Sequence, residues 1–191
     1  MIQSESNVQI KELIKLQKNA RERKKKKLFV AEGMKLTKEA AFHGKLKKIY
    51  IAQDVYEHRE RELDDFLAKQ DYEVVDTKIF RQAAQTVTPQ GMLALVEVPE
   101  YSVDTLLCDP KRSFLLLDDL RDPGNLGTIM RTAEGAGMSG VILSRESVDL
   151  FNPKVVRATM GAIFRVPFYY ADDLIEVIER LKAKQIPVYG T

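Results

Sequence analysis

Two short segments carry the side chains whose types and spacing could do chemistry. In "DPGNLGTIMRTAEGAG", Asn125 and Gly127 open a helix after an apolar strand, and Arg131 follows one turn later. The N-terminus of such a helix presents backbone N–H groups to an anion or polar ligand. Because residues 127 and 131 share a helix face, Arg131 can reach the space beyond the strand ends, where α/β sheets bind ligands. The alternative is a surface ion pair of Arg131 with Glu134 or Asp122.

The second segment is "NPKVVRATMGAIFRVP". Its Asn152-Pro153 pair initiates a helix, and Lys154 and Arg157 follow on one side of that helix. Such cations suit a phosphate or another anion, and the alternative interpretation is a basic solvated face.

Common nucleotide-binding fingerprints do not fit the first segment. Gly124 and Gly127 form only G-x-x-G, without the earlier glycine of a dinucleotide fold, and no Gly-Lys-Ser/Thr occurs in the chain. The G-x-x-G loop of KH modules joins two helices, whereas this one follows a strand. These mismatches argue against an oxidoreductase with a nicotinamide cofactor and against a triphosphate-binding protein.

Strand and helix patterns alternate along the chain and must position these residues. A helix is predicted within 6–20, followed by strands in 28–33, 47–52, 72–76 and 91–98 and by helices in 34–42, 59–70 and 77–85, the last capped by Thr77. A linker precedes strands in 113–119, 140–144, 165–170 and 186–191, and helices in 125–137, 153–164 and 172–184. The order predicts an α/β fold with a parallel sheet in the second half.

Composition and charge limit the class of protein. The 191 residues are 45% hydrophobic with a formal net charge of +2, enough for real cores without strong overall basicity. One cysteine, Cys108, a polar N-terminus and no apolar run of about 18 residues favour a cytoplasmic protein without a membrane span. The two histidines have no cysteine or carboxylate at ligand spacing, so no metal site is expected.

Basic charge is concentrated in one run near the N-terminus. "KNARERKKKK" contains Arg21, Arg23, Lys24, Lys25, Lys26 and Lys27. Such a run either contacts the phosphates of a nucleic acid or is a solvated charged turn, and the charge pattern alone leaves both interpretations open.

Taken together and in order, the two segments are much more specific. They resemble the first two motifs of the SpoU/TrmH family of RNA ribose 2′-O-methyltransferases, in the SPOUT superfamily. "FVAEGMKLTKEAAFHGKLKKIYI" and "VTPQGMLALVEV" are similar to the small ribosomal-protein-like α/β substrate-binding domain that often precedes them. The resemblance implies an RNA substrate-binding domain at 1–99, a linker at 100–111 and a SPOUT methyltransferase domain at 112–191.

The family resemblance implies methyl transfer from S-adenosylmethionine to a ribose 2′-hydroxyl of RNA, with rRNA favoured over tRNA. It places the catalytic arginine at Arg131 and the loop asparagine at Asn125, and it implies a homodimer through the methyltransferase domain. It also implies RNA phosphate contacts for the basic run at Arg21 to Lys27 and for Lys154 and Arg157. Arginine stays protonated, so a role in holding phosphate and stabilising the developing alkoxide suits it better than that of a base.

One departure from the family pattern affects the cofactor site. The third motif, which forms the knot and most of the cofactor pocket, is absent from the sequence, so we expect a fragment with an incomplete pocket. Gly190 and Thr191 would be its first edge. An RNA-binding module without catalysis therefore remains an alternative, and binding of S-adenosylmethionine to this chain would discriminate between the two.

Overall fold

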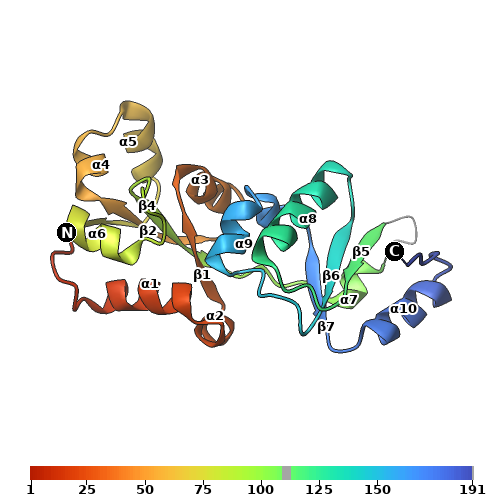
Figure 1. Ribbon diagram of the computed structural model, residues 1–191. Helices are drawn as coiled ribbons and strands as arrows, with labels where there is room; N and C mark the ends of the chain where they lie inside the picture. Colours follow the sequence, from red (N-terminus) through yellow and green to blue (C-terminus); the bar gives the residue numbers. More distant parts are fainter. Residues whose placement is uncertain (109–112, 191) are drawn as a thin grey trace. The chain divides into compact units, whose positions relative to one another are not determined.

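The computed structural model describes residues 1–108 and 113–190, which form two compact units. Unit 1 comprises Met1–Pro99 with Phe151–Pro153, and unit 2 comprises Glu100–Leu150 with Lys154–Thr191. Each unit is built around a sheet of its own, with helices packed against it (Figure 1). The α/β class predicted from the sequence is confirmed in both units.

Unit 1 contains a four-stranded mixed sheet in the order β1-β4-β2-β3. β4 is antiparallel to both β1 and β2, and β3 is parallel to β2. Its elements are α1 (Val8–Lys18), α2 (Ala20–Lys26), β1 (Leu28–Glu32), α3 (Met34–Phe42), β2 (Leu46–Ala52), α4 (Gln53–Glu57), α5 (Arg61–Leu67), β3 (Tyr72–Val75), α6 (Thr77–Ala83) and β4 (Met92–Glu97).

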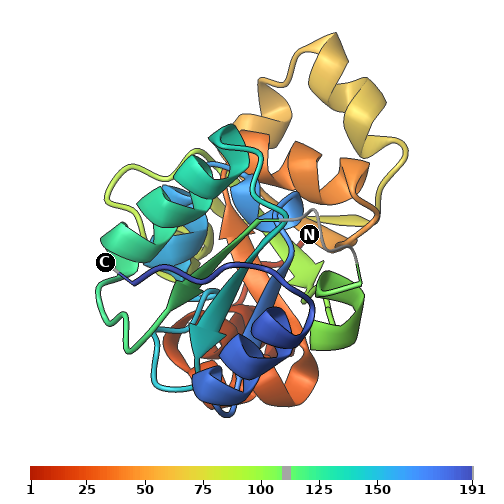
Figure 2. The same ribbon diagram turned by 90° about the vertical axis from the view of Figure 1, so that its right-hand side faces the viewer.

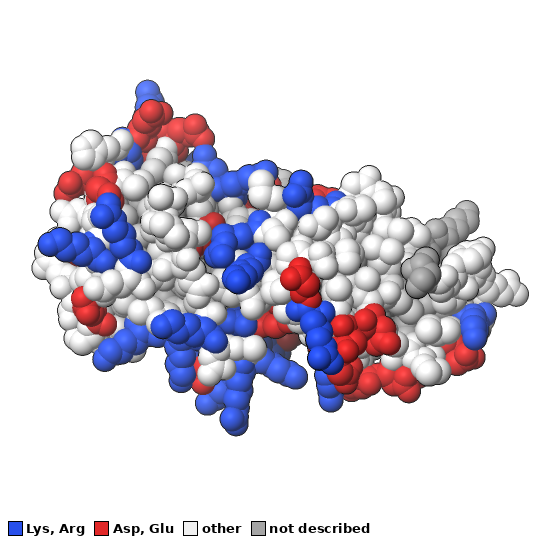
Figure 3. Space-filling view, in the orientation of Figure 1, with Lys and Arg blue, Asp and Glu red and all other residues white. Residues whose placement is uncertain are grey.

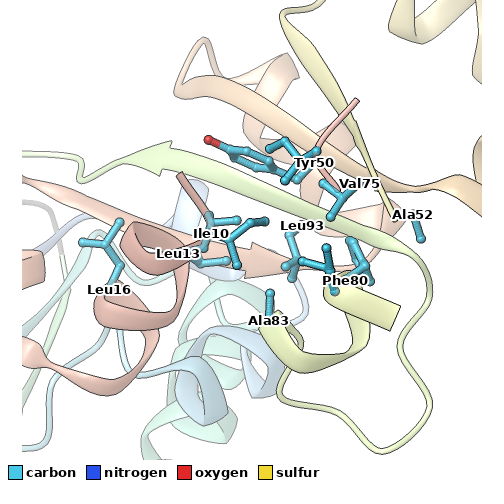
Figure 4. Packing of buried hydrophobic residues seen from close by; sticks show 12 residues of the cluster. Ile10, Leu13, Leu16, Tyr50, Ala52, Val75, Phe80, Ala83 and Leu93 are labelled. Atoms are coloured by element: carbon cyan, nitrogen blue, oxygen red, sulfur yellow. The ribbon is translucent and has the colours of Figure 1, made fainter. Parts of the chain in front are cut away.

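Side-chain alternation along β2 gives unit 1 two apolar faces. Tyr50 and Ala52 face one way and pack with residues of α1 and α6, including Leu13 and Phe80 (Figure 4). Ile49 and Ile51 face the other way and pack with Leu63 and Leu67 of α5. Because successive residues of a strand point to opposite faces, a short apolar run supplies both cores.

Unit 2 contains a three-stranded parallel sheet in the order β5-β6-β7. Its elements are α7 (Val103–Leu106), β5 (Phe114–Leu117), α8 (Pro123–Gly135), β6 (Gly140–Ser144), α9 (Pro153–Ala158), the 3₁₀ helix η1 (Ala162–Phe164), β7 (Phe168–Ala171) and α10 (Leu174–Ala183). The parallel sheet predicted from the apolar runs is therefore confirmed.

Helices cover both faces of the parallel sheet, as such a sheet requires. Val177 and Leu181 of α10 pack with Leu106 of α7 and with Ile142 of β6 on one face. α8 lies on the opposite face from α10 (Figures 1 and 2). The crossover helix α8 thus connects two neighbouring strands and delivers its first residues to their carboxyl ends.

Three predicted details of the elements are wrong. α6 is capped by Asp76 rather than Thr77, because the Asp76 carboxylate accepts the N–H groups of Lys78 and Ile79 at 2.9 and 3.2 Å. The helix predicted over 153–164 ends at Ala158, where residues 160 and 161 reverse the chain with φ of 52° and 101°. Residues 186–190 form no strand, since no described strand pairs with them.

Two general properties follow from the described ranges, 1–108 and 113–190. Within them, no helix is both long enough and apolar enough to cross a membrane. The same residues contain no group of three or more histidine, cysteine, aspartate or glutamate side chains placed to hold a metal ion.

Candidate active site

The loop between β5 and α8 brings the predicted catalytic segment to the carboxyl edge of the parallel sheet. Asp122 caps α8 by accepting the backbone N–H of Asn125 at 2.7 Å, and Pro123 occupies the first turn. Both features favour helix initiation, because proline lacks an N–H and the carboxylate satisfies one that would be unpaired. The helix therefore begins two residues before Asn125, slightly earlier than predicted.

Two buried serines, which sequence reasoning missed, hold this loop. Ser144, the last residue of β6, accepts the N–H of Asp119 at 2.8 Å, and Ser147 accepts the N–H of Leu120 at 3.2 Å. The N–H of Val148 in turn donates to the carbonyl of Leu120 at 2.8 Å. The only sequence signal was a pair of serines directly after a buried strand.

Tyr170 of β7 connects the loop that follows β6 to the sheet. Its hydroxyl donates to the carbonyl of Val148 at 2.7 Å and accepts the N–H of Leu150 at 2.8 Å. Burial raises the pKa of Tyr170 above its usual value, because the ionised form would lose its hydration. The neutral hydroxyl therefore links β7 to the loop after β6. Through Ser147 and Val148, that loop in turn holds the loop before α8.

Gly127 lets α8 approach the end of α9 closely. A Cβ atom at residue 127 would lie 2.3 Å from the Cβ of Ala158, and 3.0 and 3.1 Å from its carbonyl carbon and Cα. No side chain fits at this separation of the two helices, so packing requires glycine. Gly127 thus positions α8 against α9 and does not itself present a ligand-binding group.

The two predicted catalytic side chains are both exposed on α8. Asn125 and Arg131 have no side-chain hydrogen bond or ion pair with any other described residue. The alternative ion pairs are not formed, because Asp122 caps the helix and Glu134 pairs with Arg165. An exposed guanidinium without a protein partner remains available to a phosphate or a developing oxyanion.

Lys154 and Arg157, the two cations of the second predicted segment, differ in exposure. Lys154 is exposed, whereas Arg157 is only half-exposed and its Nη1 atom is covered from solvent. Lys154 is therefore the better candidate of the two for an RNA phosphate.

The proposed cofactor edge does not form a cradle in the described residues. Gly190 lies in an extended, exposed segment, and a Cβ there would meet no atom within 4 Å. Thr191 lies outside the described residues. A pocket edge at Gly190 is therefore unsupported by its surroundings.

Most of the basic run forms a helix, α2, while Lys27 follows it as an exposed C-cap residue with φ of 54°, and the members of the run differ in availability. Arg21, Lys24 and Lys25 are exposed and form no side-chain hydrogen bond or ion pair among the described residues, while Lys26 pairs with Glu12. Lysine and arginine side chains gather on the surface where α2 lies (Figure 3).

The prediction that Arg23 contacts RNA is wrong. The residue is 4% exposed, and Nη1 donates to the carbonyls of Leu16 and Gln17 at 2.5 and 3.1 Å. Arginine near a helix end stabilises unsatisfied carbonyls, here those of α1. Helical periodicity turns this one cation inward while its neighbours face solvent.

Comparison with known proteins places the chain in a family. Residues 112–191 match the SpoU rRNA Methylase family, and residues 7–94 match the MRM3-like substrate binding domain. The 23S rRNA (guanosine(2553)-2′-O)-methyltransferase RlmP of Bacillus subtilis is 34% identical over 192 residues, covering 100% of this chain and 72% of that protein. The chain belongs to the SpoU rRNA methylase family.

Other relatives and solved structures agree with this assignment. Human mitochondrial rRNA methyltransferase 3 is 33% identical over 178 residues, and the alignment covers 87% of this chain but 38% of the human protein. An AdoMet-bound rRNA methyltransferase from Sinorhizobium meliloti superposes with a TM-score of 0.78 at 30% identity, over 94% of this chain and 68% of that one. The family expectation drawn from the two motifs is confirmed.

Proposed function

We propose that this protein transfers a methyl group from S-adenosylmethionine to a ribose 2′-hydroxyl of rRNA. The observation that carries the proposal is the exposed guanidinium of Arg131, which has no partner among the described residues and lies on the helix that follows the carboxyl edge of a parallel sheet. Sequence relatives named as 23S and mitochondrial rRNA methyltransferases support the substrate class. S-adenosylmethionine, bound in a similar solved structure, supplies an electrophilic methyl group.

Arg131 would act by holding charge rather than by removing a proton. A guanidinium is a poor proton acceptor and offers a planar fork to two phosphate oxygens. It would orient the ribose and stabilise negative charge that develops on the 2′-oxygen. Asn125, nearly two turns earlier on the same helix, would donate or accept a hydrogen bond to the nucleotide.

The basic helix α2 would supply phosphate contacts distant from the reacting ribose. Arg21, Lys24 and Lys25 are the exposed cations of α2 that form no ion pair among the described residues, and Lys154 is an exposed cation of unit 2. Contacts of this kind add affinity and salt dependence without sequence specificity.

We also infer a homodimer formed through unit 2 and a cytoplasmic location. The family resemblance supports the dimer, and a single cysteine suits a reducing compartment. Light scattering of the purified protein, at several concentrations, tests the oligomeric state.

Transfer of tritiated methyl groups to rRNA tests the proposed function. Wild-type protein that includes the family's third motif should label ribose, and Arg131→Ala should lower the rate about 100-fold or more, the scale of losing one transition-state donor. Arg131→Lys should also be impaired, because lysine keeps the charge but loses the fork. Arg61→Ala, at an arginine 95% exposed in unit 1, is the control and should leave the rate unchanged.

Two outcomes would contradict this proposal. RNA binding without methyl transfer would favour an RNA-binding module instead. Full activity of Arg131→Ala, with ribose methylation by the wild type, would remove Arg131 from the mechanism and leave the enzyme assignment intact.

A further inference from the structure

We propose that Arg165 is a positioning residue that holds Glu134 away from Arg131 and so keeps the Arg131 guanidinium available to RNA. The proposal rests on the proposed function for its catalytic consequence. Its structural basis is the ion pair between α8 and the segment after η1.

Gly127, Arg131 and Glu134 lie along one stripe of α8. At about 100° per residue, Arg131 is turned by about 40° and Glu134 by about 20° from Gly127, in opposite directions. The segment from α9 to the end of η1 contacts this stripe at both ends, through Ala158 at Gly127 and Arg165 at Glu134. Arg131 lies between these two contacts and remains exposed.

Arg165 grips the Glu134 carboxylate with both sides of its fork. Nε contacts Oε1, and Nη2 lies 3.2 Å from Oε2. The side chains of the pair are about one-third exposed, 32% for Arg165 and 34% for Glu134. A two-pronged arginine–carboxylate contact fixes the carboxylate orientation better than a single hydrogen bond does.

The nearby carboxylate at the other end is engaged as well. Asp122 faces the first turn of α8, where its oxygen accepts the N–H of Asn125. Both carboxylates that the sequence offers to Arg131 therefore have other tasks in the fold.

Loss of Arg165 would release Glu134 toward Arg131. Residues three apart are neighbours on a helix surface, and opposite charges at that spacing attract. The released carboxylate would compete with an RNA phosphate for the same guanidinium and would repel that phosphate. Glu134→Gln removes the competing charge with almost no change in shape, so it separates this effect from the loss of Arg165 itself.

Methyl-transfer rates of four proteins test the catalytic consequence. Arg165→Ala should lower the rate about two- to fivefold, the scale of a surface ion pair. Glu134→Gln alone and the Glu134→Gln/Arg165→Ala double variant should both remain within about twofold of wild type. A loss that persists in the double variant would overturn the proposal, because Arg165 would then act directly or through the fold.

A spectroscopic readout decides the structural claim without using activity. The Nε–Hε signal of Arg131, assigned by its loss in Arg131→Lys, is followed by ¹H–¹⁵N NMR. Arg165→Ala should shift this signal and slow its exchange with water, and the double variant should restore both. An unchanged Arg131 signal in Arg165→Ala would overturn the proposal.

Failure of the proposed function is distinguishable from failure of this inference. If the wild-type protein transfers no methyl group, the proposed activity is refuted, while the Arg131 signal still decides whether Arg165 controls the pairing of Arg131. Melting temperatures of all variants identify any rate loss that follows from unfolding.

Discussion

Replacement of Gly127 by alanine tests the close approach of α8 and α9. The added Cβ would lie 2.3 Å from the Cβ of Ala158 and 3.0–3.1 Å from its backbone carbons, so the two helices must separate. Overpacking of this kind costs about 1–3 kcal/mol. Alanine in a helix interior recovers about 0.5–1 kcal/mol relative to glycine. The net expectation is a loss of up to about 2.5 kcal/mol in the free energy of unfolding.

Urea unfolding followed by far-UV circular dichroism measures this loss. Gly135→Ala is the matched control, because Gly135 ends the same helix, is exposed and has no atom within 4 Å of the position that a Cβ would take. It should be neutral or stabilise by up to about 1 kcal/mol, through reduced entropy of the unfolded chain. Adding Ala158→Gly to Gly127→Ala removes the closest clash and should restore part of the loss.

Equal stability of Gly127→Ala and Gly135→Ala would refute this packing. The helices α8 and α9 would then leave room for a methyl group, and glycine at 127 would serve another purpose. A loss that Ala158→Gly does not relieve at all would place the clash elsewhere.

Three further predictions concern the site and its supports. Tyr170→Phe should lower the free energy of unfolding by about 1–3 kcal/mol, because the carbonyl of Val148 and the N–H of Leu150 lose their partner. Tyr169→Phe, whose hydroxyl has no described partner, is the control in urea unfolding. Burial raises the pKa of Tyr50 to about 12, whereas an unfolded tyrosine ionises near 10. The stability that the neutral Tyr50 hydroxyl contributes is therefore fully present below about pH 10 and is lost as pH rises toward the folded pKa. Stability should fall less steeply with alkaline pH in Tyr50→Phe than in the wild type. Alanine at Arg21, Lys24 and Lys25 should weaken RNA binding, measured by filter binding, and lower the slope of its salt dependence by about 0.7–0.9 per lost contact. Arg23→Ala should instead destabilise unit 1, as thermal melts would show.

Much of the fold follows from local patterns in the sequence. The apolar positions of α1 and the short runs of β5 and β6 each act within a few residues, so they predict element type well, whereas the start of α8 at Pro123 was predicted two residues late. Details that depend on competing local partners failed, as at the start of α6, where two adjacent residues could both cap the helix and Asp76 does.

The sequence proposed the residues of the candidate site but did not decide whether Arg131 forms an ion pair within the protein. The spacing of Asn125 and Arg131 on a helix after a strand, with the family resemblance, led us to propose both side chains from the sequence. Spacing alone also allowed Arg131 to pair with Glu134, which lies three residues away on the same helix. That choice depends on Arg165, a residue 31 positions after Glu134 that reaches it only once β6, α9 and η1 have formed.

Tertiary packing likewise separated residues that look alike in the sequence. Arg23 and Lys24 are adjacent cations, yet one is buried against the carbonyls at the end of α1 and the other faces solvent. The sequence by itself determined most of the elements and the family, and it proposed the chemical groups of the candidate site. Only the folded chain decided which charges are available to RNA, because ion pairs and close packing join residues that the sequence keeps far apart.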